Sequence, residues 1–170
     1  MTNCDIVLNR LDDFDIHYEI AEHKRVSTME ECQLPMRLLG ALMPKNIFLC
    51  TSNRSSYRLL IAHPSSQFRT SSVSKQAHTS RLSFAPDESL TMLGTYSGAV
   101  NPFGLLFDDA CEISLLIDKL LLKEEYLLFH PLDNTKTVKI STEVLLHKFL
   151  PSISHGYTIV DMEESSKAIT

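Results

Sequence analysis

The chain has 170 residues, of which 44% are hydrophobic and 22% are charged, and its formal net charge is −5. This size and composition suit a globular protein with one core, and we expect a single domain over residues 1–170. No apolar run of about 18 residues is present, so we expect no membrane-spanning helix. No basic segment precedes an apolar stretch at the N-terminus, so we expect no signal peptide and a cytoplasmic location.

The cysteines indicate neither a zinc site nor disulfides. They are widely spaced, without a Cys-x-x-Cys pair, which is typical of buried, reduced thiols. Asp108, Asp109 and Glu112 could form a metal site, but no histidine or further carboxylate accompanies them at suitable spacing, and a solvated turn is favoured. We therefore expect no metal and no cofactor. The cysteines are Cys4, Cys32, Cys50 and Cys111.

Basic residues are unevenly distributed along a chain that is acidic overall. No acidic residue lies between Glu31 and Asp87, whereas the chain after Asp87 is acidic. The interval could present one basic face to a phosphate backbone, or its charges could scatter over the surface after folding. Its basic side chains are Arg37, Lys45, Arg54, Arg58, Arg69, Lys75 and Arg81, with His63 and His78.

The first quarter of the chain predicts two helices around a strand. Residues 5–14 place apolar side chains on one face and predict a short amphipathic helix, and residues 16–20 alternate like a strand. Two Ser/Thr–Glu pairs within residues 27–31 have capping-box spacing for a helix that runs to about Gly40. Pro35 would break or kink that helix.

The middle of the chain predicts a hairpin, a loop and a short strand. Residues 47–51 and 57–63 read as two strands joined by a polar turn. Residues 64–80 are rich in serine and threonine without a clear period, which predicts a flexible loop, with a basic arm over the substrate as the alternative. Residues 82–85 predict a strand, and residues 86–94 a helix with proline at its start.

The second half predicts further strands and one long helix. Residues 118–125 connect two apolar runs with about one helical turn, and residues 141–150 read as a helix that Ser141 or Thr142 caps and Pro151 ends. Residues 163–170 resemble a frayed tail. This irregular mixture predicts an α+β (mixed α/β) fold with a mixed sheet. The further strands are expected at residues 113–117, 126–129, 138–140 and 157–160.

A glycine- and proline-rich loop follows the predicted helix that ends near residue 94. Gly98 and Gly104 tolerate positive φ angles, and Pro102 fixes φ and removes a donor. Such a loop can bring backbone N–H groups close to a ligand, although a plain connecting loop is the alternative. Lys45 stands before one apolar run of the chain, and His130 stands at the end of another.

Three short stretches each join a polar or glycine-rich feature to an apolar run. They are Lys45-Asn46-Ile47-Phe48-Leu49, Gly98-Ala99-Val100-Asn101-Pro102 with Phe103-Gly104-Leu105, and Phe129-His130-Pro131 followed by Asn134-Thr135. In this order they resemble the YbaK/prolyl-tRNA-synthetase-associated domain family, and the likeness spreads from about His17 to Val160. The resemblance implies a mixed, partly barrel-like sheet surrounded by helices. It also implies the activity of free-standing proteins that hydrolyse mischarged prolyl-acceptor tRNA.

The residues of these stretches suit ester hydrolysis. An aminoacyl ester needs a placed water and stabilisation of the oxyanion, which N–H groups of a glycine loop can supply. Lys45 could hold a phosphate or the ester as a point charge, and His130 could orient a substrate group or move a proton. The plainer alternatives are a surface lysine and a core histidine. Asn134 could equally be a turn residue.

The resemblance assigns roles to these positions in a metal-independent site, where the ribose hydroxyl of the substrate helps to place the water. It implies catalytic positions at Lys45, Gly98, Pro102 and His130. Substrate-binding positions would be Asn46, Ala99, Val100, Asn101 and Asn134. The tRNA-binding positions come instead from the basic interval between Glu31 and Asp87, and we expect them at Arg54, Arg58, Arg69, Lys75 and Arg81.

The free-standing length and the Gly98–Pro102 loop look most like the alanine-editing branch of the family, which predicts deacylation of Ala-tRNA(Pro). Cysteinyl, seryl and threonyl esters stay open as alternatives. So do two functions without catalysis, a tRNA- or synthetase-binding module and a regulatory small-molecule binder. The expected partner is mischarged tRNA(Pro), with prolyl-tRNA synthetase or an elongation factor as a further candidate and no membrane.

Overall fold

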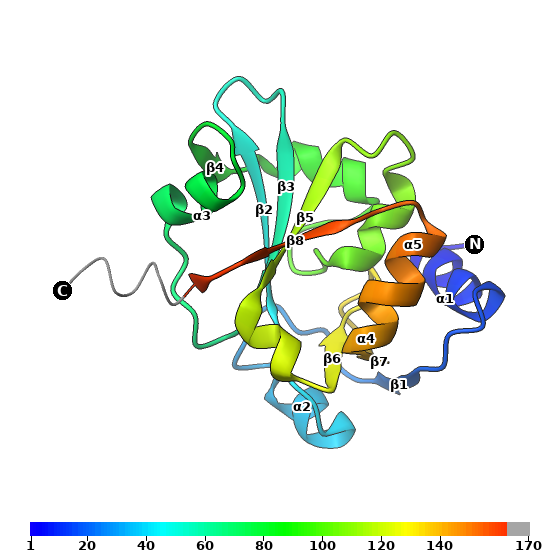
Figure 1. Cartoon of the computed structure of the whole chain (residues 1–170). Coiled ribbons are helices and arrows are strands. Elements are labelled where there is room, and N and C mark those ends of the chain that lie inside the picture. The colour runs from blue at the N-terminus through cyan, green and yellow to red at the C-terminus, as the bar shows by residue number, and fades with distance from the viewer. Residues whose placement is uncertain (163–170) are drawn as a thin grey trace.

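The computed structural model describes residues 1–162, so the tail predicted at residues 163–170 lies outside the described residues. The described chain forms two β-sheets with helices around them (Figure 1). The strands are β1 (Glu19–Glu22), β2 (Lys45–Thr51), β3 (Tyr57–Ala62), β4 (Leu82–Phe84), β5 (Ile113–Asp118), β6 (Tyr126–Phe129), β7 (Lys136–Ser141) and β8 (Tyr157–Val160).

The larger sheet is mixed and has the strand order β4-β2-β3-β5-β8. β2 pairs antiparallel with β3 and β4, whereas β3 with β5 and β5 with β8 run parallel. The smaller sheet is antiparallel, in the order β1-β7-β6. An isolated bridge between Leu42 and Leu127 joins the approach to β2 with β6. The combination of antiparallel and parallel pairs in the larger sheet confirms the predicted mixed sheet. Its partly barrel-like closure stays an expectation.

Helices are short and cover both sheets. Thr2 caps α1 with its side chain, and Gly40 ends α2 at φ +66°, where a residue without a Cβ is favoured. The last helix continues from α4 through one π-helical turn into α5, and Ser141 caps it. The helices are α1 (Asn3–Asp13), α2 (Gln33–Leu39), α3 (Thr70–Gln76), η1 (Asp87–Leu93), η2 (Pro102–Phe107), η3 (Lys119–Lys123), α4 (Thr142–Val144), η4 (Leu145–Phe149) and α5 (Leu150–Ser152).

The main core lies between the larger sheet, the smaller sheet, α1 and the last helix. Phe103 is fully buried and meets Phe129 and Phe149 edge to face, at centroid distances of 5.8 and 5.5 Å. Aromatic pairs in this geometry add about 0.5–1.5 kcal/mol each beyond the area that they bury. The core therefore fixes η2, which carries Phe103, against β6, which ends at Phe129.

Most of the predicted elements are confirmed, with several exceptions. The helix expected from Ser27 or Thr28 begins only at Gln33, so Pro35 lies in its first turn, where a missing N–H is tolerated. Residues 64–80 are not wholly a loop, because α3 forms there and buries Val73 in a second, smaller hydrophobic cluster with Leu49 of β2 and Leu82 of β4. Residues 86–94 form a 3-10 helix, η1, rather than an α-helix. The first strand begins at Glu19, three residues later than predicted, and Pro151 lies within the last helical turn instead of ending it.

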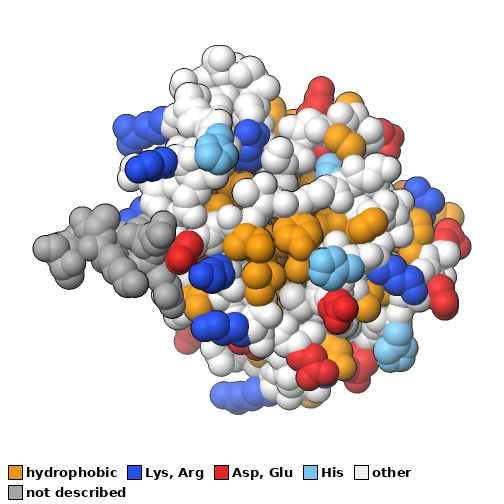
Figure 2. Space-filling view, viewed as in Figure 1, with side chains coloured by type: hydrophobic (Ala, Val, Ile, Leu, Met, Phe, Trp, Pro, Cys, Tyr) orange, Lys and Arg blue, Asp and Glu red, His pale blue; other side chains and the backbone are white. Residues whose placement is uncertain are grey.

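The two edge strands of the larger sheet are more exposed than its central strands. β8 is one edge strand, and Ile159 on it is 47% exposed. Figure 2 shows apolar side chains gathered over the middle of the face that β8 crosses in Figure 1. β4 is the opposite edge strand, and it pairs with only the second half of β2.

Replacement of Gly104 by alanine should destabilise the fold. A Cβ at this position would lie 2.7 Å from both the Cβ and the carbonyl O of Leu93, in a packed interior. We expect the free energy of unfolding to fall by about 1–3 kcal/mol, measured by urea unfolding. Gly156→Ala is the matched control, because nothing lies within 4 Å of its Cβ. Equal stability of the two variants would contradict this packing.

Candidate functional site

A cavity of about 410 Å³ lies beside the first half of β2. β3 pairs with β2 from Lys45 onward, but β4 pairs only with Leu49–Thr51, and the Ala85 N–H extends this contact to the Phe48 carbonyl. The edge of β2 over residues 45–47 therefore faces the cavity. The remaining walls come from residues 26–32, residues 43–44, residues 84–90, the loop at residues 97–100 and the end of β6.

Lys45 lines this cavity as the first residue of β2. Its Nζ donates a hydrogen bond of 3.1 Å to the carbonyl oxygen of Ser66. None of the ion pairs within residues 1–162 includes Lys45. Its positive charge is therefore not neutralised by a neighbouring carboxylate and can act on an anionic substrate group.

A buried carboxylate fixes the carbonyl that holds Lys45. Asp118, at the end of β5, is fully buried and accepts a hydrogen bond of 2.5 Å from the Ser66 hydroxyl. The same oxygen, Oδ2, accepts the His63 N–H at 2.9 Å, and Oδ1 accepts the Leu120 N–H at 3.1 Å. These bonds satisfy the carboxylate inside the protein and hold the turn after β3 in one conformation.

Asn46 lines the cavity next to Lys45. Its Nδ2 donates to the carbonyl oxygen of Pro44 at 3.3 Å, but its Oδ1 is buried without a hydrogen-bond partner among the described residues. A buried, unpaired acceptor costs free energy. Asn46 is therefore suited to accept a hydrogen bond from a donor such as a substrate ammonium or hydroxyl group.

Gly98 brings bare backbone to the cavity. Its φ of +96° lies in the region that favours glycine, and it lines the cavity together with Val100. Within residues 1–162, no hydrogen bond uses the amide N–H of Gly98 or of Val100. Two neighbouring N–H donors of this kind are the usual components of an oxyanion site.

The buried residues that follow in this loop fix the conformation of its backbone. Asn101 is buried, and its Nδ2 donates to the carbonyl oxygens of His130 and, at 3.2 Å, of Ala99. Its Oδ1 accepts the Phe103 N–H at 2.9 Å and caps η2, where Pro102 occupies the first position. Ala99, Asn101 and Pro102 are buried and do not line the cavity. Their predicted roles in binding and catalysis stay predictions.

His130 lines the cavity at the end of β6 and is largely buried. Its Nδ1 lies 2.8 Å from the carbonyl oxygen of Lys136, which can only accept, so Nδ1 carries the proton in the neutral ring. Nε2 is then an acceptor, and the Cys32 thiol, a weak donor, lies 3.9 Å from it. Burial lowers the pKa of His130, with His23 adding to this effect and the Lys136 carbonyl opposing it.

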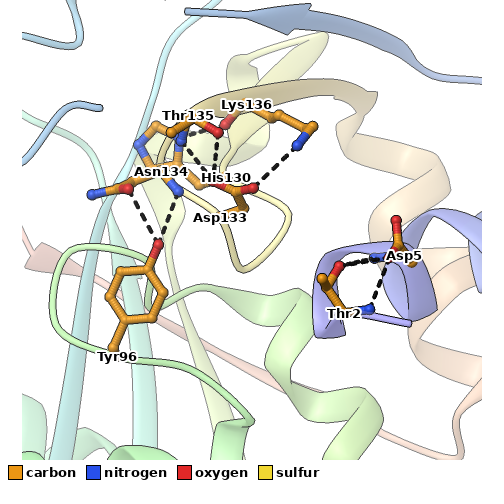
Figure 3. A network of polar contacts seen from close by, with 8 residues as sticks. All are labelled: Thr2, Asp5, Tyr96, His130, Asp133, Asn134, Thr135 and Lys136. Carbon is orange, nitrogen blue, oxygen red and sulfur yellow. Dashed lines mark hydrogen bonds and ion pairs between the residues drawn. The ribbon is translucent and has the colours of Figure 1, made fainter. Parts of the chain in front are cut away.

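Asn134 connects the segments on either side of the cavity without lining it. Its Nδ2 donates to the Val26 carbonyl at 2.8 Å. Its Oδ1 accepts the Tyr96 hydroxyl at 3.2 Å, as Figure 3 shows. A Cβ at Gly98 would lie 3.7 Å from the same Nδ2. Nearby, Asp133 accepts from Thr135 and Lys136, which lowers its pKa to about 2 despite partial burial.

The structure brings together three of the five basic residues predicted to bind tRNA. Arg69, Lys75 and Arg81 line a second hollow of about 640 Å³ around α3, which we call the basic hollow. Figure 2 shows Lys and Arg side chains at the upper left of this face, where Figure 1 places α3. Arg54 instead pairs with Glu88 at 3.5 Å, and Arg58 donates to its neighbours Ser56 and Tyr57.

No group of three or more metal-ligating side chains is found within residues 1–162. Asp108 is a buried structural residue, since it accepts the N–H groups of Glu112 and Ile113 and pairs with His155 at 3.5 Å. This corrects the expectation of a solvated turn for Asp108. Cys4, Cys32 and Cys50 are buried and Cys111 is exposed, and none of the four is in a disulfide. No helix within the same residues is long and apolar enough to span a membrane.

Sequence reasoning missed three groups around the cavity. Asp118 and Ser66 support Lys45 from segments distant in the sequence, and Tyr96 bridges to Asn134. A carboxylate at the end of an apolar strand is a weak signal that could have pointed to Asp118. Nothing in the sequence pattern pairs Tyr96 with Asn134, because 38 residues separate them.

Because its folded-state pKa is lowered, His130 should make the protein less stable in acid. The unfolded chain takes up this proton near pH 6.5, before the folded protein does, so the free energy of unfolding falls as pH drops below about 6.5. The loss levels off below the folded-state pKa and amounts to about 1.4 kcal/mol per unit of pKa difference. Urea unfolding at pH 7.5 and 5.5 measures this difference in the free energy of unfolding.

His130→Gln should show a smaller loss of stability between these two pH values than the wild type. His17→Gln is the control, because His17 is exposed and makes no contact with the cavity. Parallel pH profiles for the wild type and His130→Gln would contradict the assigned environment of His130.

Comparisons with known proteins identify the family of the chain. Residues 23–148 match the model of the aminoacyl-tRNA editing domain. The prolyl-tRNA editing protein ProX of Acetoanaerobium sticklandii is 31% identical over 141 residues, which cover 82% of this chain and 85% of that protein. The mouse prolyl-tRNA synthetase associated domain-containing protein 1 is 28% identical over 159 residues, or 91% of this chain and 93% of that one.

A solved structure described as a candidate trans-editing enzyme for prolyl-tRNA synthetase shares the fold. Its TM-score is 0.69 at 13% identity, over 95% of this chain and 97% of that one. The matched region contains Lys45, the Gly98 loop and His130, so the cavity lies within the shared domain. The chain therefore belongs to the aminoacyl-tRNA editing domain family.

Proposed function

We propose that the chain is a trans-editing deacylase that hydrolyses mischarged Ala-tRNA(Pro) to alanine and tRNA(Pro). The family gives the reaction class, which is hydrolysis of an aminoacyl-tRNA ester. The observation that carries the proposal is one cavity that contains an unneutralised lysine, two unbonded backbone N–H groups and a neutral histidine. These groups match what an ester hydrolase needs around its substrate carbonyl.

In the proposed mechanism, the alanyl ester enters the cavity beside the edge of β2. The N–H groups of Gly98 and Val100 stabilise the oxyanion that forms when water attacks the ester carbon. The C–O bond to the ribose then breaks, and the ribose hydroxyl leaves with a proton from the attacking water. Lys45 holds an anionic group of the substrate, and Nε2 of His130 accepts a hydrogen bond from the water or from the ribose. Catalysis rests mainly on positioning.

Support for an alanyl substrate comes from the loop sequence and from the apolar part of the cavity. Val26, Met43, Val100 and Phe129 line it, and they suit a methyl side chain. A hydrophobic pocket discriminates by about 1–3 kcal/mol per methylene, so exclusion of proline depends on size rather than on lost contacts. Release of the cysteinyl ester with sparing of the alanyl ester would overturn the alanyl assignment alone.

The remaining parts of the proposal concern the partners, the place of action and the domain. We propose that the substrate is a mischarged tRNA(Pro), bound in the cytoplasm, with prolyl-tRNA synthetase or an elongation factor as a further partner. The relatives named for prolyl-tRNA editing and for the synthetase-associated domain support this choice. We also propose that residues 1–170 form a single editing domain.

Lys45→Ala should abolish rapid deacylation. In single-turnover reactions with Ala-tRNA(Pro), we expect a fall of about 100-fold or more in the rate constant, because the charge that holds the substrate in place is lost. Lys123→Ala is the control, since Lys123 is exposed and outside the cavity. If the wild type binds tRNA but leaves the alanyl, cysteinyl, seryl and threonyl esters intact, the proposal is contradicted and a tRNA-binding module is favoured.

Affinity for tRNA should fall steeply with salt. If the basic hollow contacts the phosphate backbone, the logarithm of the binding constant should fall linearly with the logarithm of salt concentration. Arg69→Gln, Lys75→Gln or Arg81→Gln should each reduce the slope by roughly 0.7–0.9, the value for one lost phosphate contact. Filter binding between 50 and 200 mM salt measures this, with Lys123→Gln as control. A salt-independent affinity would exclude the basic hollow as the contact surface.

A further inference from the structure

Phe84 is unusually exposed for an aromatic side chain. It is 70% exposed, more than any other large hydrophobic side chain of residues 1–162 except Met1. It also lines the same cavity as Lys45 and Gly98. An exposed phenylalanine costs solvation free energy in the free protein, and at the mouth of a binding cavity it is suited to cover an apolar surface of a ligand.

The position of the Phe84 ring is fixed by its neighbours. Phe84 is the last residue of β4 and stands opposite Leu49 of β2, while Leu82 two residues earlier is fully buried. The ring of Phe68 lies 5.7 Å from the Phe84 ring, tilted by 58°. The next residue, Ala85, is bonded through its N–H to the Phe48 carbonyl at 2.9 Å. The ring is therefore held in place on both sides along the chain and braced by Phe68.

The charge near Phe84 favours an uncharged ligand group. Asp87 lines the cavity and lies close to Phe84 in sequence, whereas the next carboxylate, Glu88, pairs with Arg54. Carboxylates repel a phosphate, whereas the face of a nucleobase is uncharged and stacks well on an aromatic ring. The basic groups that suit phosphates are Lys45, on another wall of the cavity at the start of β2, and the side chains of the basic hollow.

We propose that Phe84 is the platform on which the terminal base of the acceptor strand stacks. The inference rests on the proposed function, because it takes the substrate to be an aminoacyl ester of the terminal ribose. That ribose carries both the ester and the base, so an ester placed at Lys45 and Gly98 leaves the base at the mouth of the cavity. Stacking on Phe84 binds the base without reading its hydrogen-bonding edge.

Binding of two non-hydrolysable analogues tests the platform. The first is 3′-alanylamino-3′-deoxyadenosine, in which an amide replaces the ester, and the second is the same amide on a methyl riboside that lacks the base. We expect wild type to bind the adenosine analogue about 10- to 100-fold more tightly. Phe84→Ala should lose most of this preference and bind the baseless analogue as wild type does. NMR titration measures both constants.

Two further variants separate stacking from general damage. Phe84→Tyr retains the aromatic face and should retain the preference for the base. Ile159→Ala removes an exposed apolar side chain from the opposite edge strand of the same sheet and should change neither constant. An equal loss for both analogues in Phe84→Ala, or no loss for either, would overturn the platform. So would the absence of any preference for the base in the wild type.

The outcome for the platform is independent of the outcome for the reaction. Base-dependent binding that needs Phe84, together with an intact Ala-tRNA(Pro) ester, would overturn the proposed function and leave the platform standing. Rapid deacylation of Ala-tRNA(Pro), together with analogue binding that does not depend on the base, would support the proposed function and overturn the platform.

Discussion

The site depends on the buried side chain of Asn101, which ties the Gly98 loop to the end of β6. Its amide donates to the carbonyls of Ala99 and His130, and its carbonyl caps η2 through the Phe103 N–H. All of its hydrogen-bonding groups are thus used inside the protein, where an unsatisfied amide would be costly. Through this one residue, the two unbonded N–H groups of the loop and the imidazole of His130 take a fixed relation to each other. The aromatic cluster of Phe103, Phe129 and Phe149 then anchors both ends of the connection in the core.

The larger sheet supplies the other half of the site through an incomplete pairing. Because β4 is short, the first residues of β2 keep one free edge, and Lys45 stands there with its charge not neutralised. Asp118 and Ser66 hold that charge indirectly, through a carbonyl oxygen rather than through a carboxylate. A direct ion pair would have weakened the attraction of Lys45 for an anionic substrate. Asp118 contacts Ser66 and not Lys45, so it positions the lysine through Ser66 and leaves the charge of the lysine available to a substrate.

Much of the fold and part of the site could be predicted from the sequence. The hairpin of β2 and β3, the buried strands β5 and β6, and the cap at Ser141 follow from apolar patterns and capping residues that act locally. α3 was missed because its serine-rich sequence has weak helix propensity, and burial of Val73 decides its conformation. Lys45, Gly98, Val100 and His130 do line one cavity. Asp118 has only a weak local signal, its place at the end of an apolar strand, and Tyr96 and the exposed Phe84 have none, since their roles arise from contacts between distant segments.

The central claim is that the aminoacyl ester lies between Lys45 and the loop amides of Gly98 and Val100. A crystal structure with 3′-alanylamino-3′-deoxyadenosine bound tests this most directly. We predict that the alanyl carbonyl oxygen lies within about 3 Å of both amide nitrogens and that the alanyl group lies inside the cavity beside β2. An analogue bound in the basic hollow, or with its carbonyl turned away from the loop, would contradict the claim.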